Sequence, residues 1–166
     1  MAIGRWKVLP LLAPLCAAIF ILVSSAQLPP VVASHFSGSG AADGFMPRAS
    51  YAVLMTVLAV GIPGMLSFFA TRFMDSPHPP VNIPNRAYWL APERREATLR
   101  YLGSRLRWLG LGVMVFLCYI HGLVLLANRE QPAALPAWPF AIGMVLFLFM
   151  VFAWTLAVTR RFSKTG

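Results

Sequence analysis

The sequence predicts an all-α integral membrane protein: a bundle of four transmembrane helices with an amphipathic juxtamembrane helix on the cytoplasmic side. Composition is the first reason, because 58% of the 166 residues are apolar, 11% are charged and the mean hydropathy is +0.70. Soluble domains carry about 25% charged residues. The second reason is four uncharged stretches of membrane-spanning length, and the third is an uneven distribution of basic residues between the loops.

The four uncharged stretches are each long enough to cross a bilayer. About twenty helical residues at 1.5 Å per residue span a hydrocarbon core of about 30 Å. We therefore predict one membrane domain, 1–166, with spans at 8–27, 50–70, 108–127 and 138–158, an outer loop at 28–49 and an inner loop at 71–107. The first span also resembles a signal peptide, but its long apolar run favours an uncleaved helix.

The basic residues predict the orientation of the chain. Of the 14 Lys and Arg residues, all but Arg48 and Arg129 fall on the side of the inner loop and both termini. Cytoplasmic loops carry such an excess, so both termini are expected in the cytoplasm. The net charge of +9 is then explained by contact with anionic lipid headgroups, and nucleic-acid binding is not expected. Interfacial aromatics fit this frame: Trp6, Trp108 and Trp154 near the inner boundary, Tyr51 and Trp138 near the outer one.

The two long loops differ in their predicted structure. In the outer loop, "VVASHF" favours a short strand, and "GSG" and "ADG" are turn signals. In the inner loop, "DSPHPPVNIPN" is held extended by its prolines. From Pro92 onward the pattern is helical, with Leu99, Leu102, Leu106 and Leu109 on one face among arginines. This part is predicted to be an interfacial amphipathic helix that runs into the third span.

A group of His, Gly and Asp residues stands out in the outer loop. The stretch "LPPVVASHFSGSGAADGF" contains His35, Phe36, Gly40, Asp43 and Gly44. It resembles the signature of a bacterial membrane family called domain of unknown function 1648, whose module also occurs in SdpI-type immunity and signalling proteins. The resemblance covers the first span, this loop and the second span, and it implies a multi-pass protein of the bacterial inner membrane. The block "NIPNRAYWLAPERREATL" resembles the inner loop of a proteobacterial subset of that family.

Two interpretations of the outer-loop group stay open. His35 and Asp43 lie eight residues apart across glycine turns, so they can meet as a hydrogen-bonded pair that senses a ligand, an ion or a proton at the outer surface. Alternatively, Asp43 caps a turn while His35 and Phe36 dock the loop onto the helix ends. One His and one carboxylate are too few to predict a metal site, and no cofactor is expected.

A second polar and aromatic group lies in the inner loop. Its members are Asn82, Asn85, Tyr88, Trp89, Glu93, Arg94 and Arg95. These residues suit the binding of a protein partner, a lipid headgroup or another anion. In the alternative interpretation, the aromatic residues only anchor at the interface, Asn85 supports a turn and the arginines meet lipid.

Few polar residues lie within the predicted spans. His121 is the one ionisable residue that would be a functional suspect there, but with no charged partner in any span we expect a neutral imidazole bonded to a backbone carbonyl or to Tyr119. Cys16 and Cys118 are isolated and are interpreted as apolar packing residues. No GxSxG, HExxH or Walker motif is present in the sequence, so no catalytic residue is assigned.

These patterns favour a non-enzymatic membrane accessory or a sensor or immunity-like protein that contacts a protein or peptide through its outer loop. One alternative is a small membrane enzyme or transport component whose site is the inner block, residues 85–95. Another is a subunit that packs against a larger membrane complex.

Overall fold

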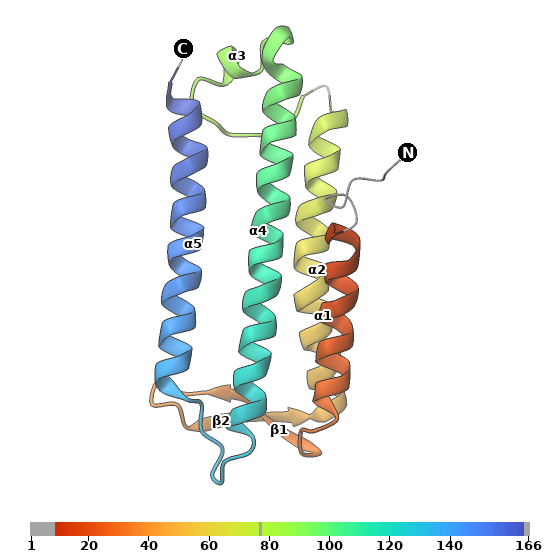
Figure 1. Ribbon diagram of the computed structural model, residues 1–166, viewed down its shortest axis with the longest axis vertical. Coiled ribbons are helices and arrows are strands. Elements are labelled where there is room, and N and C mark those ends of the chain that lie inside the picture. Colours follow the sequence, from red (N-terminus) through yellow and green to blue (C-terminus); the bar gives the residue numbers. More distant parts are fainter. Residues whose placement is uncertain (1–8, 77, 165–166) are drawn as a thin grey trace.

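Four helices run side by side, with a β-hairpin at one end and a short helix at the other (Figure 1). The structure is a computed structural model that describes residues 9–76 and 78–164. The elements are α1 (Leu9–Ser25), β1 (Val31–Phe36), β2 (Ala42–Pro47), α2 (Arg48–Asp75), α3 (Arg86–Trp89), α4 (Pro92–Ala127) and α5 (Ala137–Ser163). Trp6, an expected interfacial anchor, and the basic Arg5 and Lys7 lie outside the described residues.

Three of the helices are long and apolar enough to cross a membrane: α2, α4 and α5. Many of their large apolar side chains face outward, including Val57, Val115 and Phe149, which are 59%, 62% and 68% exposed. A surface this apolar is costly in water and suits contact with lipid. The prediction of a multi-pass membrane protein is confirmed to the extent that three helices have the length and composition of membrane spans. The fourth crossing stays a prediction, because α1 has 17 residues.

The predicted amphipathic helix and third span form a single element. α4 continues without a break for 36 residues, from Pro92 to Ala127, and rises past the ends of its neighbours (Figure 1). At 1.5 Å per residue its length is about 54 Å, which exceeds the hydrocarbon core by far. The arginine-rich first turns are therefore the extension of a span. Their placement at a membrane surface stays a prediction.

Close approach of α2 and α4 depends on glycines of α4. A Cβ at Gly110 would lie 3.2 Å from Cα of Pro63, and one at Gly103 would lie 3.2 Å from the carbonyl oxygen of Ala70. Helices in membranes gain much of their association from such close backbone packing. Pro63 is accommodated inside α2, which continues through it.

The larger of two hydrophobic core clusters in the described part of the chain lies at the hairpin end of the bundle, and the smaller one, formed by Ile83, Leu102 and Phe162, lies at the other end. Ile21 of α1, Val32 of β1, Met55 of α2 and Val124 of α4 are buried together at the hairpin end. Tyr51 belongs to the same cluster and is 3% exposed. It was expected as an interfacial anchor, and this expectation is wrong, because its ring packs inside the bundle.

The outer loop contains an antiparallel hairpin. The predicted strand "VVASHF" is confirmed as β1, which pairs with β2. "GSG" lies in the connecting turn, with Gly40 at φ 86°. The turn predicted at "ADG" is wrong, since Asp43 and Gly44 lie within β2. The register shifts around His35, which pairs with Gly44, and this irregularity accommodates a glycine in the strand.

We predict that Gly110→Val destabilises the bundle, because the added side chain would push α4 away from Pro63. Overpacking of this kind costs about 1–3 kcal/mol. Gly122→Val is the matched control in the same helix, since a Cβ at Gly122 meets nothing within 4 Å. Unfolding in mixed micelles with increasing denaturing detergent measures both. Equal midpoints for the two variants would contradict the packing described here.

Candidate functional site

The outer-loop residues come together on the hairpin. His35 Nδ1 lies 2.5 Å from Asp43 Oδ1, and the two side chains are 75% and 47% exposed. Gly44 makes this pairing possible, because a Cβ there would lie 2.8 Å from Cβ of His35. Phe36 packs against the core cluster below. The sequence-predicted pair therefore forms, and it lies at the surface.

The hairpin is fastened to the helices through its backbone. Asn128, just after α4, donates from Nδ2 to the carbonyl oxygen of Ala33 at 2.9 Å, and its Oδ1 accepts from the Ala33 amide at 2.8 Å. The side-chain amide of Asn128 thus satisfies both backbone groups of Ala33, as a neighbouring strand would on the edge of β1 that does not face β2. Arg48 donates to the carbonyl oxygen of Leu28 at 2.9 Å. These contacts hold the hairpin in one position on the end of the bundle.

The connection between α4 and α5 also holds the hairpin turn. The amide of Leu135 donates to the carbonyl oxygen of Gly40 at 2.8 Å, and the amide of Ala42 donates to that of Ala133 at 3.3 Å. A Cβ at Gly40 would lie 3.0 Å from the carbonyl oxygen of Leu135. The positive φ and this close approach both require glycine. Gly40, which the sequence pattern singled out, therefore has a structural role in the turn.

One side of the hairpin stays accessible. Val31 and Phe45 are 60% and 61% exposed; Phe45 follows Gly44, the partner of His35, whereas Val31 pairs with Pro47 at the other end of the hairpin. Phe45 is a site residue that the sequence pattern did not single out. Its position next to Gly44, which pairs with His35, places a large aromatic group near the His35–Asp43 hydrogen bond. The surface formed by Val31, His35, Asp43 and Phe45 is called the hairpin face below.

Below the hairpin, a buried polar trio joins three helices. His121 of α4 is 0% exposed, and its Nε2 lies 2.8 Å from Oγ of Ser24 in α1, while Nδ1 lies 2.9 Å from the hydroxyl of Tyr51 in α2. Ser24 Oγ is 2.5 Å from the carbonyl oxygen of Phe20, to which it donates. Having one proton, Ser24 must then accept from Nε2, and Tyr51 must donate to Nδ1.

The hydrogen bonds of Ser24 indicate a structural role for the trio and not a catalytic one. A nucleophilic serine would donate to its histidine base, whereas Ser24 already donates to a backbone carbonyl. The trio therefore satisfies polar groups in an apolar environment. Ser25 Oγ, nearby in α1, is buried and has no hydrogen-bond partner among the described residues.

The expectation that His121 bonds to a backbone carbonyl or to Tyr119 is wrong, because its two ring nitrogens lie against Ser24 and Tyr51. Tyr119 is only two residues from His121 in α4. Residues two apart on a helix point to different sides, so the two side chains cannot meet. Tyr119 is 37% exposed, and its hydroxyl donates to the carbonyl oxygen of Pro139 at 2.5 Å. Ser24 and Tyr51 were not recognised as partners because they lie 97 and 70 residues away in the chain.

The inner block holds the end of α5. Asn85 Nδ2 and Trp89 Nε1 both donate to the carbonyl oxygen of Phe162, at 3.0 and 3.1 Å. This carbonyl belongs to the last turn of α5, whose carbonyls lack partners within the helix. Asn85 has φ 52°, a left-handed conformation that Asn tolerates better than most residues. The ring of Phe162 is fully buried beside Trp89.

Other members of the inner block bind neighbouring backbone. The Arg94 guanidinium lies 3.9 Å from the centre of the Tyr88 ring, and its Nε donates to the Tyr88 carbonyl oxygen at 3.1 Å. Arg95 donates to the carbonyl oxygen of Ser76. Asn82 and Glu93 are exposed, and neither makes a side-chain hydrogen bond within the described part of the chain. The contacts thus favour the structural interpretation of this block.

A catalytic or transport site in the inner block would need a polar cavity. Two grooves on the described part of the chain are lined by other residues, mainly apolar ones on α4, α5, α1 and α2. Asn85, Tyr88, Glu93 and Arg94 line neither. Over the same residues, no group of three or more His, Cys, Asp or Glu side chains could hold a metal ion.

Comparison with known proteins bears on one segment. Residues 12–60 match the model of a family described as a domain of unknown function (DUF1648). This segment contains α1 from Leu12 onward, the hairpin and the first half of α2. The match supports the resemblance noted for the His35 loop, over less than half of the chain. No curated protein and no solved structure matches.

We predict that His121→Leu destabilises the protein, because it leaves the buried Tyr51 hydroxyl without an acceptor. An unsatisfied buried group costs about 1–3 kcal/mol. Adding Tyr51→Phe and Ser24→Ala to His121→Leu should restore part of the loss, since no orphaned group then remains. Leu126→Val, at a position of α4 that is 48% exposed, is the control. If the triple variant is less stable than His121→Leu in denaturing-detergent titrations, the assigned bonding is incorrect.

Proposed function

We propose that the chain is a non-enzymatic protein of the bacterial inner membrane, with four spans and both termini in the cytoplasm, whose hairpin face binds a protein or peptide partner outside the cytoplasm. The observation that carries this proposal is the combination of a firmly docked backbone with exposed, chemically mixed side chains. The hairpin is bonded at Ala33, Leu28 and Gly40, yet Phe45 and the His35–Asp43 pair are accessible.

The mixture on the hairpin face suits protein recognition. Aromatic groups supply large contact area with little loss of side-chain entropy, and they are enriched at interfaces. Phe45 and Val31 supply the apolar part, and the pair beside them supplies directional hydrogen bonds. A rigid backbone lowers the cost of ordering the surface on binding. In the described residues of the inner block, Asn85, Trp89, Arg94 and Arg95 bond to neighbouring backbone, whereas Asn82 and Glu93 are exposed and make no side-chain hydrogen bond.

Charge supports the proposed orientation. The hairpin end carries Arg48 and Arg129, whereas the other end carries the arginines of α3, the start of α4 and the end of α5. Basic residues concentrate on the cytoplasmic side of membrane proteins. This distribution supports a hairpin end that lies outside the cytoplasm. The 17 residues of α1 begin at Leu9 and measure about 26 Å at 1.5 Å per residue, so a crossing by this helix uses its whole length.

The orientation predicts that position 39 reacts from outside the cell. With Cys16 and Cys118 replaced by Ala, a Ser39→Cys variant in intact spheroplasts should be labelled by a membrane-impermeant maleimide. A Lys164→Cys variant in the same background is the control and should react only after the membrane is opened. Labelling of Lys164→Cys alone in closed spheroplasts would exclude the proposed topology.

The hairpin face is expected to contact its partner directly. A photo-crosslinking phenylalanine analogue at Phe45 should yield an adduct of defined mass in intact membranes, whereas the same analogue at the outward-facing Val57 should not yield it. Adding His35→Ala and Asp43→Ala should reduce the Phe45 adduct by about tenfold or more, because each deletes a directional contact at the centre of the face.

Two further measurements make this result interpretable. The double variant should still label at Ser39→Cys as the parent does, which shows that the hairpin is in place. Ser37→Ala serves as a matched change in the exposed turn and should leave the adduct yield unaltered. An undiminished adduct in the double variant would show that the pair takes no part in recognition.

A further inference from the structure

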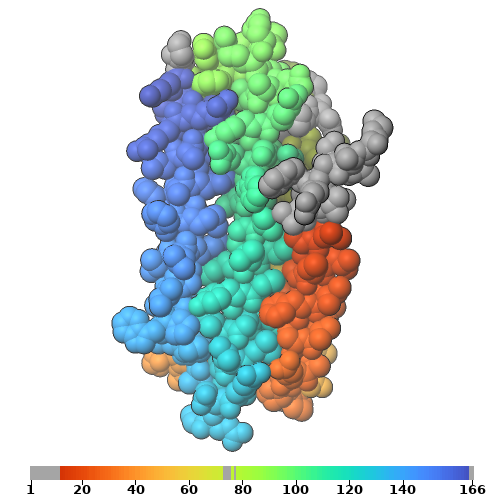
Figure 2. All heavy atoms as spheres, in the orientation of Figure 1, coloured from red at the N-terminus to blue at the C-terminus, as the bar shows by residue number. Residues whose placement is uncertain are grey.

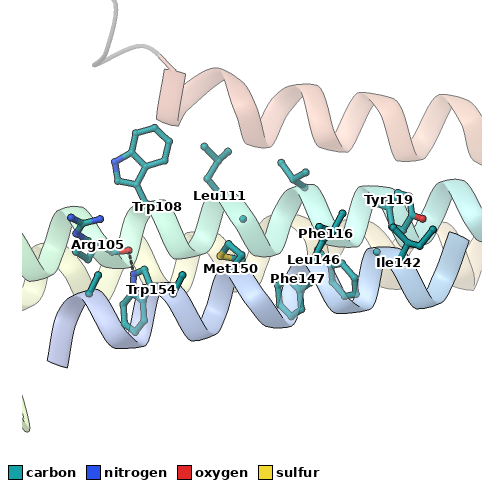
Figure 3. Close-up of a pocket in the computed structure, with 15 residues that line it drawn as sticks. Arg105, Trp108, Leu111, Phe116, Tyr119, Ile142, Leu146, Phe147, Met150 and Trp154 are labelled. Carbon is teal, nitrogen blue, oxygen red and sulfur yellow. Dashed lines mark hydrogen bonds between the residues drawn. The ribbon is translucent and has the colours of Figure 1, made fainter. Parts of the chain in front are cut away.

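A long groove runs between α4 and α5. Its volume is about 870 Å³, and its walls are almost entirely apolar (Figure 3). The floor is formed where the helices touch: the Phe116 and Phe147 rings stack at 4.1 Å, and Met150 lies against Gly112. α5 is otherwise largely exposed, and in Figure 2 it stands as a separate ridge beside α4. The groove is thus a channel along the membrane-facing surface of the protein.

The end of the groove nearer the hairpin is closed. The Tyr119 ring lies so near Gly143 that a Cβ at this glycine would be 2.1 Å from Cε1 of the tyrosine. The bond from the Tyr119 hydroxyl to Pro139 fixes the ring in this position. From Arg105 to Tyr119 the groove follows 15 residues of α4, and the two ends lie about 21 Å apart at a rise of 1.5 Å per residue. The hydrocarbon of one leaflet is about 15 Å thick. The groove is therefore long enough to hold an acyl chain of one leaflet together with the start of its headgroup.

The other end of the groove is cationic. Arg105 lines it, and Ala157, one helical turn before Arg161, lines it from α5. Both guanidinium groups lie over the Tyr101 ring, that of Arg161 at 4.4 Å and that of Arg105 at 5.0 Å from its centre. Neither is paired with a carboxylate in the described part of the chain. Two guanidinium groups on one aromatic ring, without a carboxylate partner, make this end of the groove suited to an anion.

We propose that this groove binds one anionic phospholipid of the cytoplasmic leaflet, with an acyl chain along Phe116 and Phe147 and the phosphate at Arg105 and Arg161. The proposal rests on the orientation given above and not on the hairpin partner. An apolar channel that is closed at its deep end and cationic at its mouth matches the amphiphilic shape of such a lipid. A helix of a second copy, about 10 Å wide, would leave both charges uncompensated.

Native mass spectrometry of the purified full chain in detergent tests this. Titration with phosphatidylglycerol should give one tightly retained lipid, and phosphatidylcholine should bind at least fivefold more weakly. Arg105→Gln and Arg161→Gln should each weaken phosphatidylglycerol binding about fivefold, as expected for one basic group near an anionic headgroup. Arg160→Gln, on the adjacent position of α5, is the matched control and should bind as the parent does.

A second pair of variants tests the channel. Ala153→Phe fills the groove and should reduce retention of the lipid, whereas Val145→Phe adds the same ring on an exposed position outside it. Equal binding of both lipids, no effect of either Arg→Gln change, or a stable dimer that is lost in Ala153→Phe would overturn the proposal. The assay does not involve the hairpin face, so failure of partner binding and failure of lipid binding are separate results.

Discussion

A bilayer offers no water to the polar groups of a helix bundle, and this constraint determines where the polar residues of the protein lie. Ser24, Tyr51 and His121 come from three different helices, and each satisfies another. Where the chain leaves the helices, Asn128 pairs with the Ala33 backbone, and Asn85 and Trp89 complete the last turn of α5. The backbone at both ends of the bundle is thus bonded internally, as a lipid environment requires.

Much of the fold follows from local patterns. The apolar stretches predict the long helices, because length and composition alone decide whether a segment can cross a membrane. "VVASHF" becomes a strand as its β-branched content indicates. The "ADG" segment shows the limit of such rules: pairing with β1 overrides the turn tendency of Asp43-Gly44, and the contact between Gly44 and His35 is a cross-strand one that no local pattern reveals.

The candidate sites were predictable in part. The eight-residue spacing of His35 and Asp43 indicates their pairing correctly. The partners of His121 were not predictable, because they are brought together only by the packing of α1, α2 and α4. Nor does any local pattern show that Asn85 and Trp89 would meet Phe162, over 70 residues later. The polarity of the inner block suggests a binding surface, whereas its donors are used within the molecule.

The bonds made by α4 bear on how the chain can be divided. The segment matched by the family model, residues 12–60, contains Ser24, Tyr51 and Ala33. Their partners, His121 and Asn128, lie far outside it. If the segment were cut out, the hydroxyl of Tyr51 would lose its acceptor on His121, and the backbone of Ala33 would lose both of its hydrogen bonds to Asn128. In this protein the segment therefore depends on α4 for the partners of its polar groups, although α4 lies outside the matched residues.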